Sequence, residues 1–166
     1  MEQLFSDMQE RLETLYKAIE TAVADLPAEA LDWKPATDMN SVAVLLTHTA
    51  GALRYWVGDV AGGKPSGRVR SQEFEMRDVD AAELMARLRA ALDFAGEVLG
   101  ELDAATLGET RTMGQKDESH SVGWALLHGL EHTAIHTGHI QITRQLWDQR
   151  SDCLLYTSPS PRDRTR

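Results

Sequence analysis

Cysteine is almost missing from this chain, and long apolar runs are missing altogether. The single Cys153 excludes an intramolecular disulfide framework and is typical of a reducing, cytoplasmic setting. No stretch approaches the roughly 18 uncharged apolar residues that a membrane-spanning helix needs. The chain also lacks a basic opening segment followed by an apolar run, so no signal peptide is predicted.

Basic residues are in short supply as well. Lys and Arg number 17 against 26 Asp and Glu, which gives a formal net charge of −9 at pH 7. Nucleic acid and anionic membrane surfaces repel such a charge, so we expect neither as a partner. With 42% hydrophobic and 26% charged residues, the composition is that of an ordinary globular protein. A length of 166 residues suits one domain, since domains run to about 100–200 residues.

The end of the chain differs from the rest. The sequence SDCLLYTSPSPRDRTR contains two Ser-Pro steps and shows no helical period. It resembles translated vector sequence, so we expect residues 151–166 to be a non-native or disordered tail and residues 1–150 to form the domain. Because Cys153 lies in this tail, the domain has no thiol of its own. Chemistry that needs sulfur would have to take it from a small molecule.

Helical periodicity dominates the body of the chain. Apolar residues recur at steps of three and four over residues 1–26, 41–62, 80–102 and 121–147. Asn40 or Ser41 can cap the second of these helices, and Asp80 with Glu83 makes a capping-box pattern at the third. No alternation typical of strands competes with this pattern. We therefore predict an all-α fold, most simply a four-helix bundle.

Histidines gather in the fourth predicted helix, at positions 128, 132, 136 and 139. At about 100° per residue these four lie within roughly 80° of one another, on one face. Trp124 and Ile135 border that face, so we expect it to point toward the core. Buried imidazoles need partners, and a metal ion is a shared partner for side chains one helical turn apart. His120 precedes the helix, and we expect it to be an ordinary surface residue.

His48 lies in the middle of the second apolar stripe. Taken alone, it could be a buried histidine with an ordinary hydrogen bond or a metal ligand. Facing helices of a bundle are where metal sites are built, so the histidine-rich fourth helix favours the ligand interpretation. The sequence HTAIH lacks the Glu of the HExxH metalloprotease motif, and that class of enzyme is not indicated.

Two stretches resemble a known family. WALLHGLEHTAIHTGHIQITRQLW is similar to the fourth helix of the DinB/YfiT-like superfamily of metal-binding four-helix bundles. LDWKP and MNSVAVLLTHTAGALRYWVGDVAGG resemble the connector and second helix of the same family. The resemblance covers residues 1–150 and implies that the metal ligands are His48, His132 and His136. It implies a divalent metal, with Zn favoured and Ni or Fe as alternatives.

The resemblance also implies a reaction. Characterised members include transferases that use bacillithiol or mycothiol and a thiol-dependent maleylpyruvate isomerase. We therefore expect a metal-dependent S-transferase that activates a low-molecular-weight thiol for attack on an electrophile. Two alternatives remain open at this point: a metal-binding stress or accessory protein without turnover, and a metal-dependent hydrolase. A homodimer is also left open. Candidates for the pocket around the metal are His128, His139, Tyr55, Trp56 and Trp124.

Overall fold

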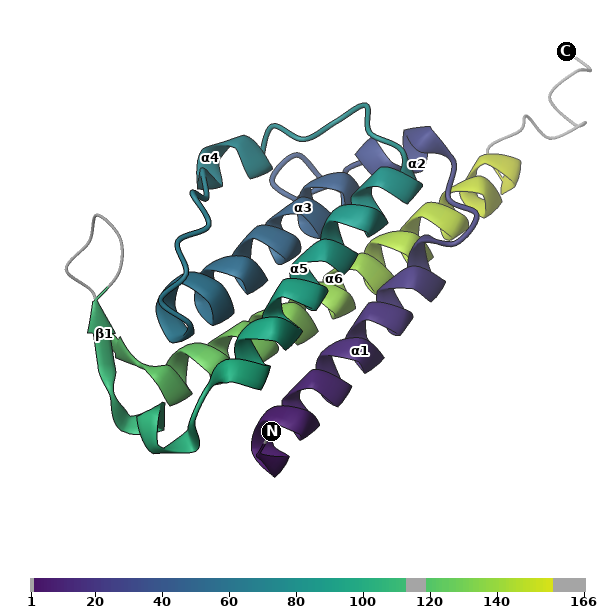
Figure 1. Ribbon diagram of the computed structural model, residues 1–166. Helices are drawn as coiled ribbons and strands as arrows, with labels where there is room; N and C mark the ends of the chain where they lie inside the picture. The colour runs from purple at the N-terminus through teal and green to yellow at the C-terminus, as the bar shows by residue number, and fades with distance from the viewer. Residues whose placement is uncertain (1, 113–118, 157–166) are drawn as a thin grey trace, which may run out of the picture.

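The computed structural model describes residues 2–112 and 119–156 (Figure 1). Four long helices account for most of them: α1 (Gln3–Val23), α3 (Val42–Leu53), α5 (Ala81–Glu101) and α6 (Val122–Tyr156). The predicted all-α four-helix bundle is confirmed. Among the described residues, no helix combines the length and the apolar character that crossing a membrane requires.

The four helices pack in a ring in which α1 and α3 are diagonal to each other. Both α1 and α3 pack against α5 and against α6. Figure 1 shows that α3 and α5 run in the same direction, whereas α3 and α6 run in opposite directions. The chain must therefore return along the bundle between α3 and α5. Residues 62–80 make this crossover, which contains the single-turn helix α4 (Arg70–Glu73).

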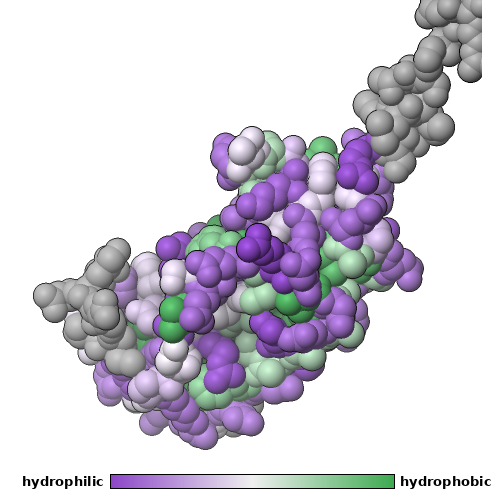
Figure 2. Space-filling model, turned by 90° about the horizontal axis from the view of Figure 1, so that it is seen from above, coloured by the Kyte–Doolittle hydropathy of each residue, from purple (hydrophilic) through white to green (hydrophobic). Residues whose placement is uncertain are grey.

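The core is a continuous cluster of apolar side chains from all four helices. Its largest fully buried members include Phe5, Leu12, Leu46, Leu88 and Ile140. Complete burial of such a side chain stabilises the fold by roughly 1.5–3 kcal/mol. The face seen in Figure 2 is covered mainly by hydrophilic residues. This division between inside and outside is what the helical periodicity of the sequence predicts.

Both predicted helix caps are present. Ser41 Oγ accepts a hydrogen bond from the Val44 N–H at 3.3 Å, so Ser41 and not Asn40 is the cap of α3. Asp80 Oδ1 accepts from the Glu83 N–H at 2.8 Å at the start of α5. Each cap satisfies a backbone donor that has no partner within its helix, which fixes where the helix begins.

The second predicted helix does not continue as a regular α-helix to residue 62. After Leu53 it becomes the π-helix η1 (Arg54–Ala61), which ends with the Gly62 N–H donating to the Val57 carbonyl, five residues earlier. Gly58 lies in this segment, and a Cβ added there would come within 2.3 Å of the Phe94 ring of α5. The wider turn alters the direction of the following side chains, so their placement could not be read from a 3.6-residue period.

Several short elements were not predicted. Helix α2 (Ala28–Asp32) lies in the connector, and the 3-10 helix η2 (Ala104–Gly108) follows α5. Strands β1 (Thr110–Thr112) and β2 (Ser119–Ser121) pair antiparallel, with Arg111 opposite His120. The expectation of no strand is therefore wrong at this point. Strands of three residues are too short for an alternating pattern to show in the sequence.

Helix α6 continues to Tyr156, nine residues beyond the predicted end at Trp147. No residue incompatible with a helix interrupts the chain before Pro159, which explains the extension. Near residue 147 the helix is held by edge-to-face packing of Trp33 on Trp147, with ring centroids 5.6 Å apart, and by the Arg150 guanidinium over the Trp147 ring. Residues 157–166 of the expected tail lie outside the described residues.

We predict that a chain ending at Arg150 keeps the stability of the full chain. The contacts of Trp33, Trp147 and Arg150 all remain in that shorter chain. Circular dichroism melts of the two proteins should give midpoints within about 2 °C of each other, because surface changes usually alter stability by less than about 0.5 kcal/mol. A much lower midpoint for the shorter chain would show that residues 151–166 stabilise the bundle.

Candidate metal site

Three histidines from two helices meet where α3 packs on α6. His48 lies on α3, whereas His132 and His136 lie one turn apart on α6. Each offers a ring nitrogen, and these nitrogens all lie within 4.8 Å of one another. The His48 ring centroid is 4.9 Å from that of His132 and 5.1 Å from that of His136. The antiparallel packing of α3 on α6 thus brings together the three residues that the sequence indicated, in a cluster that could hold one metal ion.

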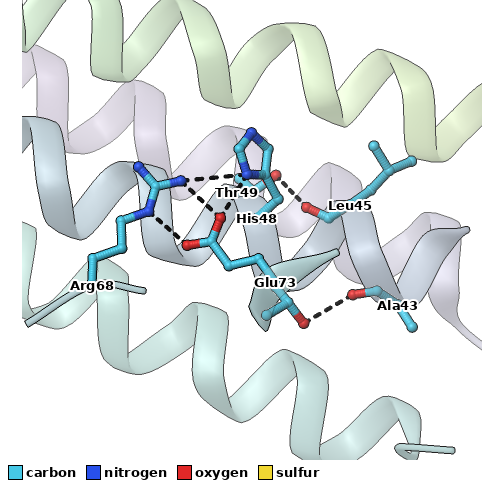
Figure 3. A network of polar contacts seen from close by, with 7 residues as sticks. Ala43, Leu45, His48, Thr49, Arg68 and Glu73 are labelled. Atoms are coloured by element: carbon cyan, nitrogen blue, oxygen red, sulfur yellow. Dashed lines mark hydrogen bonds and ion pairs between the residues drawn. The ribbon is translucent and has the colours of Figure 1, made fainter. Parts of the chain in front are cut away.

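A carboxylate holds His48 in one orientation (Figure 3). Glu73 Oε2 lies 2.7 Å from His48 Nδ1, and both side chains are buried. Arg68 fixes Glu73 in turn, donating from Nε to Oε1 at 2.6 Å and from Nη2 to Oε2 at 2.8 Å. Burial alone would raise the pKa of Glu73, but the hydrogen bonds from Arg68 and His48 hold that pKa below its usual value.

This arrangement sets the tautomer of His48. A carboxylate can only accept, so His48 Nδ1 carries the proton and Nε2 keeps its lone pair free. A ligand histidine in metalloproteins commonly donates its second nitrogen to a carboxylate, which orients the ring and makes it a stronger ligand. The pair of Glu73 and His48 has this form. Glu73 was missed at the sequence level, because it lies in the crossover, where no periodicity indicates which side chains turn inward.

The two histidines of α6 are held in their neutral form. Burial, with smaller contributions from His136, His48, His128 and Arg68, lowers the pKa of His132 to about 3. Burial, His48 and His139 together lower the pKa of His136 to about 4. Metal binding requires neutral imidazole, so neither side chain has to lose a proton at pH 7 before it can act as a ligand.

One buried nitrogen of the cluster lacks a partner. Among the described residues, His132 Nδ1 finds no hydrogen bond although the atom is buried. Leaving such a group unpaired costs roughly 1–3 kcal/mol. Three imidazoles, one of them held by a carboxylate, form a donor set suited to Zn, Ni, Cu or Fe. The residues present therefore fit a divalent metal ion of this group.

A cluster of aromatic rings borders the three-histidine site. The rings of His120, Trp124 and His128 stack in a row, with centroids 3.9 Å and 4.8 Å apart. Trp56 meets all three edge-on, at 5.4, 5.3 and 4.7 Å. Tyr55 packs on Trp56 at 5.0 Å, and the row leads on to His132, 5.8 Å from His128. We call Tyr55, Trp56, His120, Trp124 and His128 the aromatic cluster.

Four of the five candidate pocket residues lie in this cluster. The fifth, His139, is exposed on the other side of the site, where its Nδ1 lies 3.2 Å from Nδ1 of His136. His120, which was expected to be an ordinary surface residue, is a half-buried member of the cluster on β2. The short hairpin places it there, and nothing in the sequence indicated that hairpin.

The expectation that the histidine face points into the core is wrong. Trp124 and Ile135, which served as markers of the core side, are 43% and 50% exposed. The buried face of α6 carries Leu126 and Ile140 together with hydroxyl side chains such as Thr133 and Thr137, whose hydroxyls donate to the carbonyl four residues earlier. A threonine whose hydroxyl is hydrogen-bonded in this way can be buried, but a pattern of apolar residues does not identify it as a core residue. The histidines lie at the edge of the core.

Comparisons with known proteins place this geometry in a family. The DinB superfamily model matches residues 11–140. A conserved protein from Enterococcus faecalis superposes with a TM-score of 0.69 at 16% identity, over 88% of this chain and 98% of that one. A protein from Streptococcus pneumoniae gives 0.62 at 14% identity, over 87% and 90%. These two structures show the shared fold. No curated protein matches the chain in sequence.

We predict that Glu73→Gln weakens metal binding by about 10- to 100-fold, the usual effect of removing a ligand's outer partner. The amide keeps the shape of Glu73 but removes the negative charge next to His48 and leaves Arg68 uncompensated. Competition with a zinc chelator would measure the dissociation constant. Glu75→Gln is the matched control, since Glu75 is exposed two residues away. Equal constants for the two variants would show that Glu73 has no role in metal binding.

Proposed function

Because the chain belongs to the DinB superfamily, we propose that it is a metal-dependent S-transferase that activates a low-molecular-weight thiol for attack on an electrophile. The metal would be held by His48, His132 and His136, whose nitrogens lie close enough together to share one ion. This cluster is the observation on which the proposal rests. We favour Zn as the metal, with Ni or Fe as alternatives.

The number of ligands supports a reactive site. A divalent ion held by three imidazoles would keep its full charge, and such an ion would make a bound thiol or water ionise far more readily than in solution. Glu73 keeps Nε2 of His48 directed at the cluster, and burial keeps His132 and His136 neutral. The chain thus supplies neutral, oriented donors at physiological pH.

The thiol would come from outside the chain. The side chains that the structure describes include no cysteine, so the described part of the chain offers the histidines no thiol. In the proposed reaction the thiol S–H loses its proton to water, the sulfur forms a bond to the electrophilic carbon, and that carbon releases its leaving group with the bonding electrons. Both substrates are then small molecules, and we expect neither nucleic acid nor a membrane to take part.

The aromatic cluster supports binding of an electrophile beside the metal site. Its row of rings leads directly to His132, so a molecule bound against these rings would lie beside the three histidines. These aromatic side chains favour an apolar or aromatic electrophile, because rings bury large areas and stack with other rings. We also place the protein in the cytoplasm, on the argument that a single cysteine suits a reducing compartment.

We predict one divalent metal per chain, with His48→Ala, His132→Ala and His136→Ala each losing most of it. Each substitution removes one of three donors, and two imidazoles alone hold an ion much less tightly. Metal analysis of protein purified without a histidine tag would measure the content. His120→Ala is the control, because His120 lies outside the three-histidine cluster. Full occupancy in His48→Ala would show that the site does not span α3 and α6.

The thiol proposal has a test of its own. In the Co(II)-substituted protein, small thiols should produce a sulfur-to-cobalt charge-transfer band, and the native-metal protein should conjugate a thiol to a chlorodinitrobenzene. Free thiols have a pKa near 8.5, so only a few per cent are ionised at neutral pH without the metal. Both signals should disappear in His136→Ala and persist in Glu75→Gln, because Glu75 is exposed and belongs neither to the three-histidine cluster nor to the aromatic cluster.

The outcome of that test also decides between the alternative functions. If no thiol alters the cobalt spectrum, the S-transferase proposal is wrong. Metal-dependent ester or amide hydrolysis by the same protein would then support the hydrolase. A protein that binds the metal but performs neither reaction would be a metal-binding accessory protein.

A further inference from the structure

Helix α6 carries apolar side chains on two opposite faces. Besides its buried face, it exposes Trp124 (43%), Leu127 (70%), Ile135 (50%), Ile142 (54%) and Leu146 (39%). We call these five residues the outer stripe. They recur at helical spacing over 22 residues, so the stripe is about 33 Å long at 1.5 Å per residue. Single exposed apolar residues are common, but a stripe along a whole helix marks an interaction surface.

The same face carries little charge. Between Trp124 and Leu146, a range that the structure describes throughout, Glu131 is the only exposed charged residue. Arg144 lies in this range but is half-buried and donates to the carbonyls of Ala22 and Ala24 at the end of α1. By contrast, α1 and α5 each expose five charged residues: Asp7, Glu10, Arg11, Lys17 and Glu20 on α1, and Glu83, Arg87, Asp93, Glu97 and Glu101 on α5.

From these observations we infer that the outer stripe is the contact surface between two copies of this chain. A surface with a single charge, Glu131, along its length is best matched by another surface that is poor in charge, and α6 of a second copy is such a surface. The net charge of −9 makes two copies repel each other when acidic faces such as those of α1 and α5 approach. The outer stripe is where that repulsion is least and where apolar area can be buried.

The dimensions agree with a dimer. Two copies related by a two-fold axis present the same patch to each other, so the stripe would pack against itself. Ile135 lies midway between Trp124 and Leu146, and Gly138 nearby has open space where a Cβ would lie, so the two backbones can approach closely there. A stable interface covers about 800 Å² on each partner. A helix contact about 33 Å long, extended by the adjoining surfaces of α1 and α3, approaches that area.

The position of the stripe relates it to the site. On α6 the histidines lie between the buried face and the outer stripe, so a second copy would border the metal site without supplying a ligand. The dimer does not depend on the proposed reaction. Metal content and dimer mass can therefore be measured separately, and either proposal can fail without the other.

Molar mass in solution tests the inference. Light scattering after size exclusion should give the mass of two 18.4 kDa chains for the unaltered protein. The double variant Ile135→Glu/Ile142→Glu should have half that mass, because it buries like charges against each other. Val69→Glu is the control, since Val69 is 51% exposed but lies in the crossover near α5, which is diagonal to α6. Circular dichroism would verify that all three are folded.

A cross-link provides a second measurement that does not rely on destabilising the dimer. With Cys153→Ser as background, the domain has no other thiol, so Ile135→Cys should form a disulfide-linked dimer on mild oxidation and Val69→Cys should not. A monomeric unaltered protein at tens of micromolar would overturn the inference. So would a dimer that survives the double glutamate substitution, or an Ile135→Cys protein that cross-links no more than Val69→Cys.

Discussion

The antiparallel packing of α3 against α6 is the contact on which the rest of the site depends. It places one histidine of α3 opposite two histidines that are one turn apart on α6, with ring centroids 4.9 Å and 5.1 Å from His48. Two rigid helices hold these rings in place because their backbones are fixed by internal hydrogen bonds and their contact is fixed by the core. The same burial removes water from His132 and His136 and keeps them neutral. Packing, rather than any local motif, thus creates both the geometry and the protonation state that a metal ion needs.

A second consequence follows from the direction of the helices. Since α3 and α5 run in the same direction, the chain between them must cross the length of the bundle. This crossover carries Arg68 and Glu73 to His48, and Gly51 of α3 leaves room for them, because a Cβ there would lie 2.1 Å from Glu73 Oε1. The connection that topology requires therefore also orients a histidine of the site. In an up-and-down bundle with short loops, no segment would be available for this task.

Helix α6 combines three surfaces on one cylinder. One face packs on α1 and α3 through apolar and hydroxyl residues, the next carries the histidines, and the third is the outer stripe. Because apolar residues lie on opposite sides, they indicate no single direction for the core. This is why Trp124 and Ile135, read as core markers, are in fact exposed. The exposure of Trp124 and Ile135 is also the basis of the inferred dimer surface, since apolar residues that do not pack on the core of their own chain can pack on a second copy.

The sequence by itself determined what depends on local spacing. Steps of three and four between apolar residues determined the four helices, Asp80 and the pair Asn40–Ser41 indicated where two of them begin, and the i, i+4 spacing placed His132 and His136 on one side of α6. His48 could be named as their companion only through its position in a stripe and the family resemblance. Only the tertiary structure decided that Glu73 fixes His48, that His120 joins the aromatic cluster and that the second helix becomes a π-helix at Arg54. These features join residues far apart in the chain, or depend on how closely two helices approach, and the period of a single helix carries no information about either.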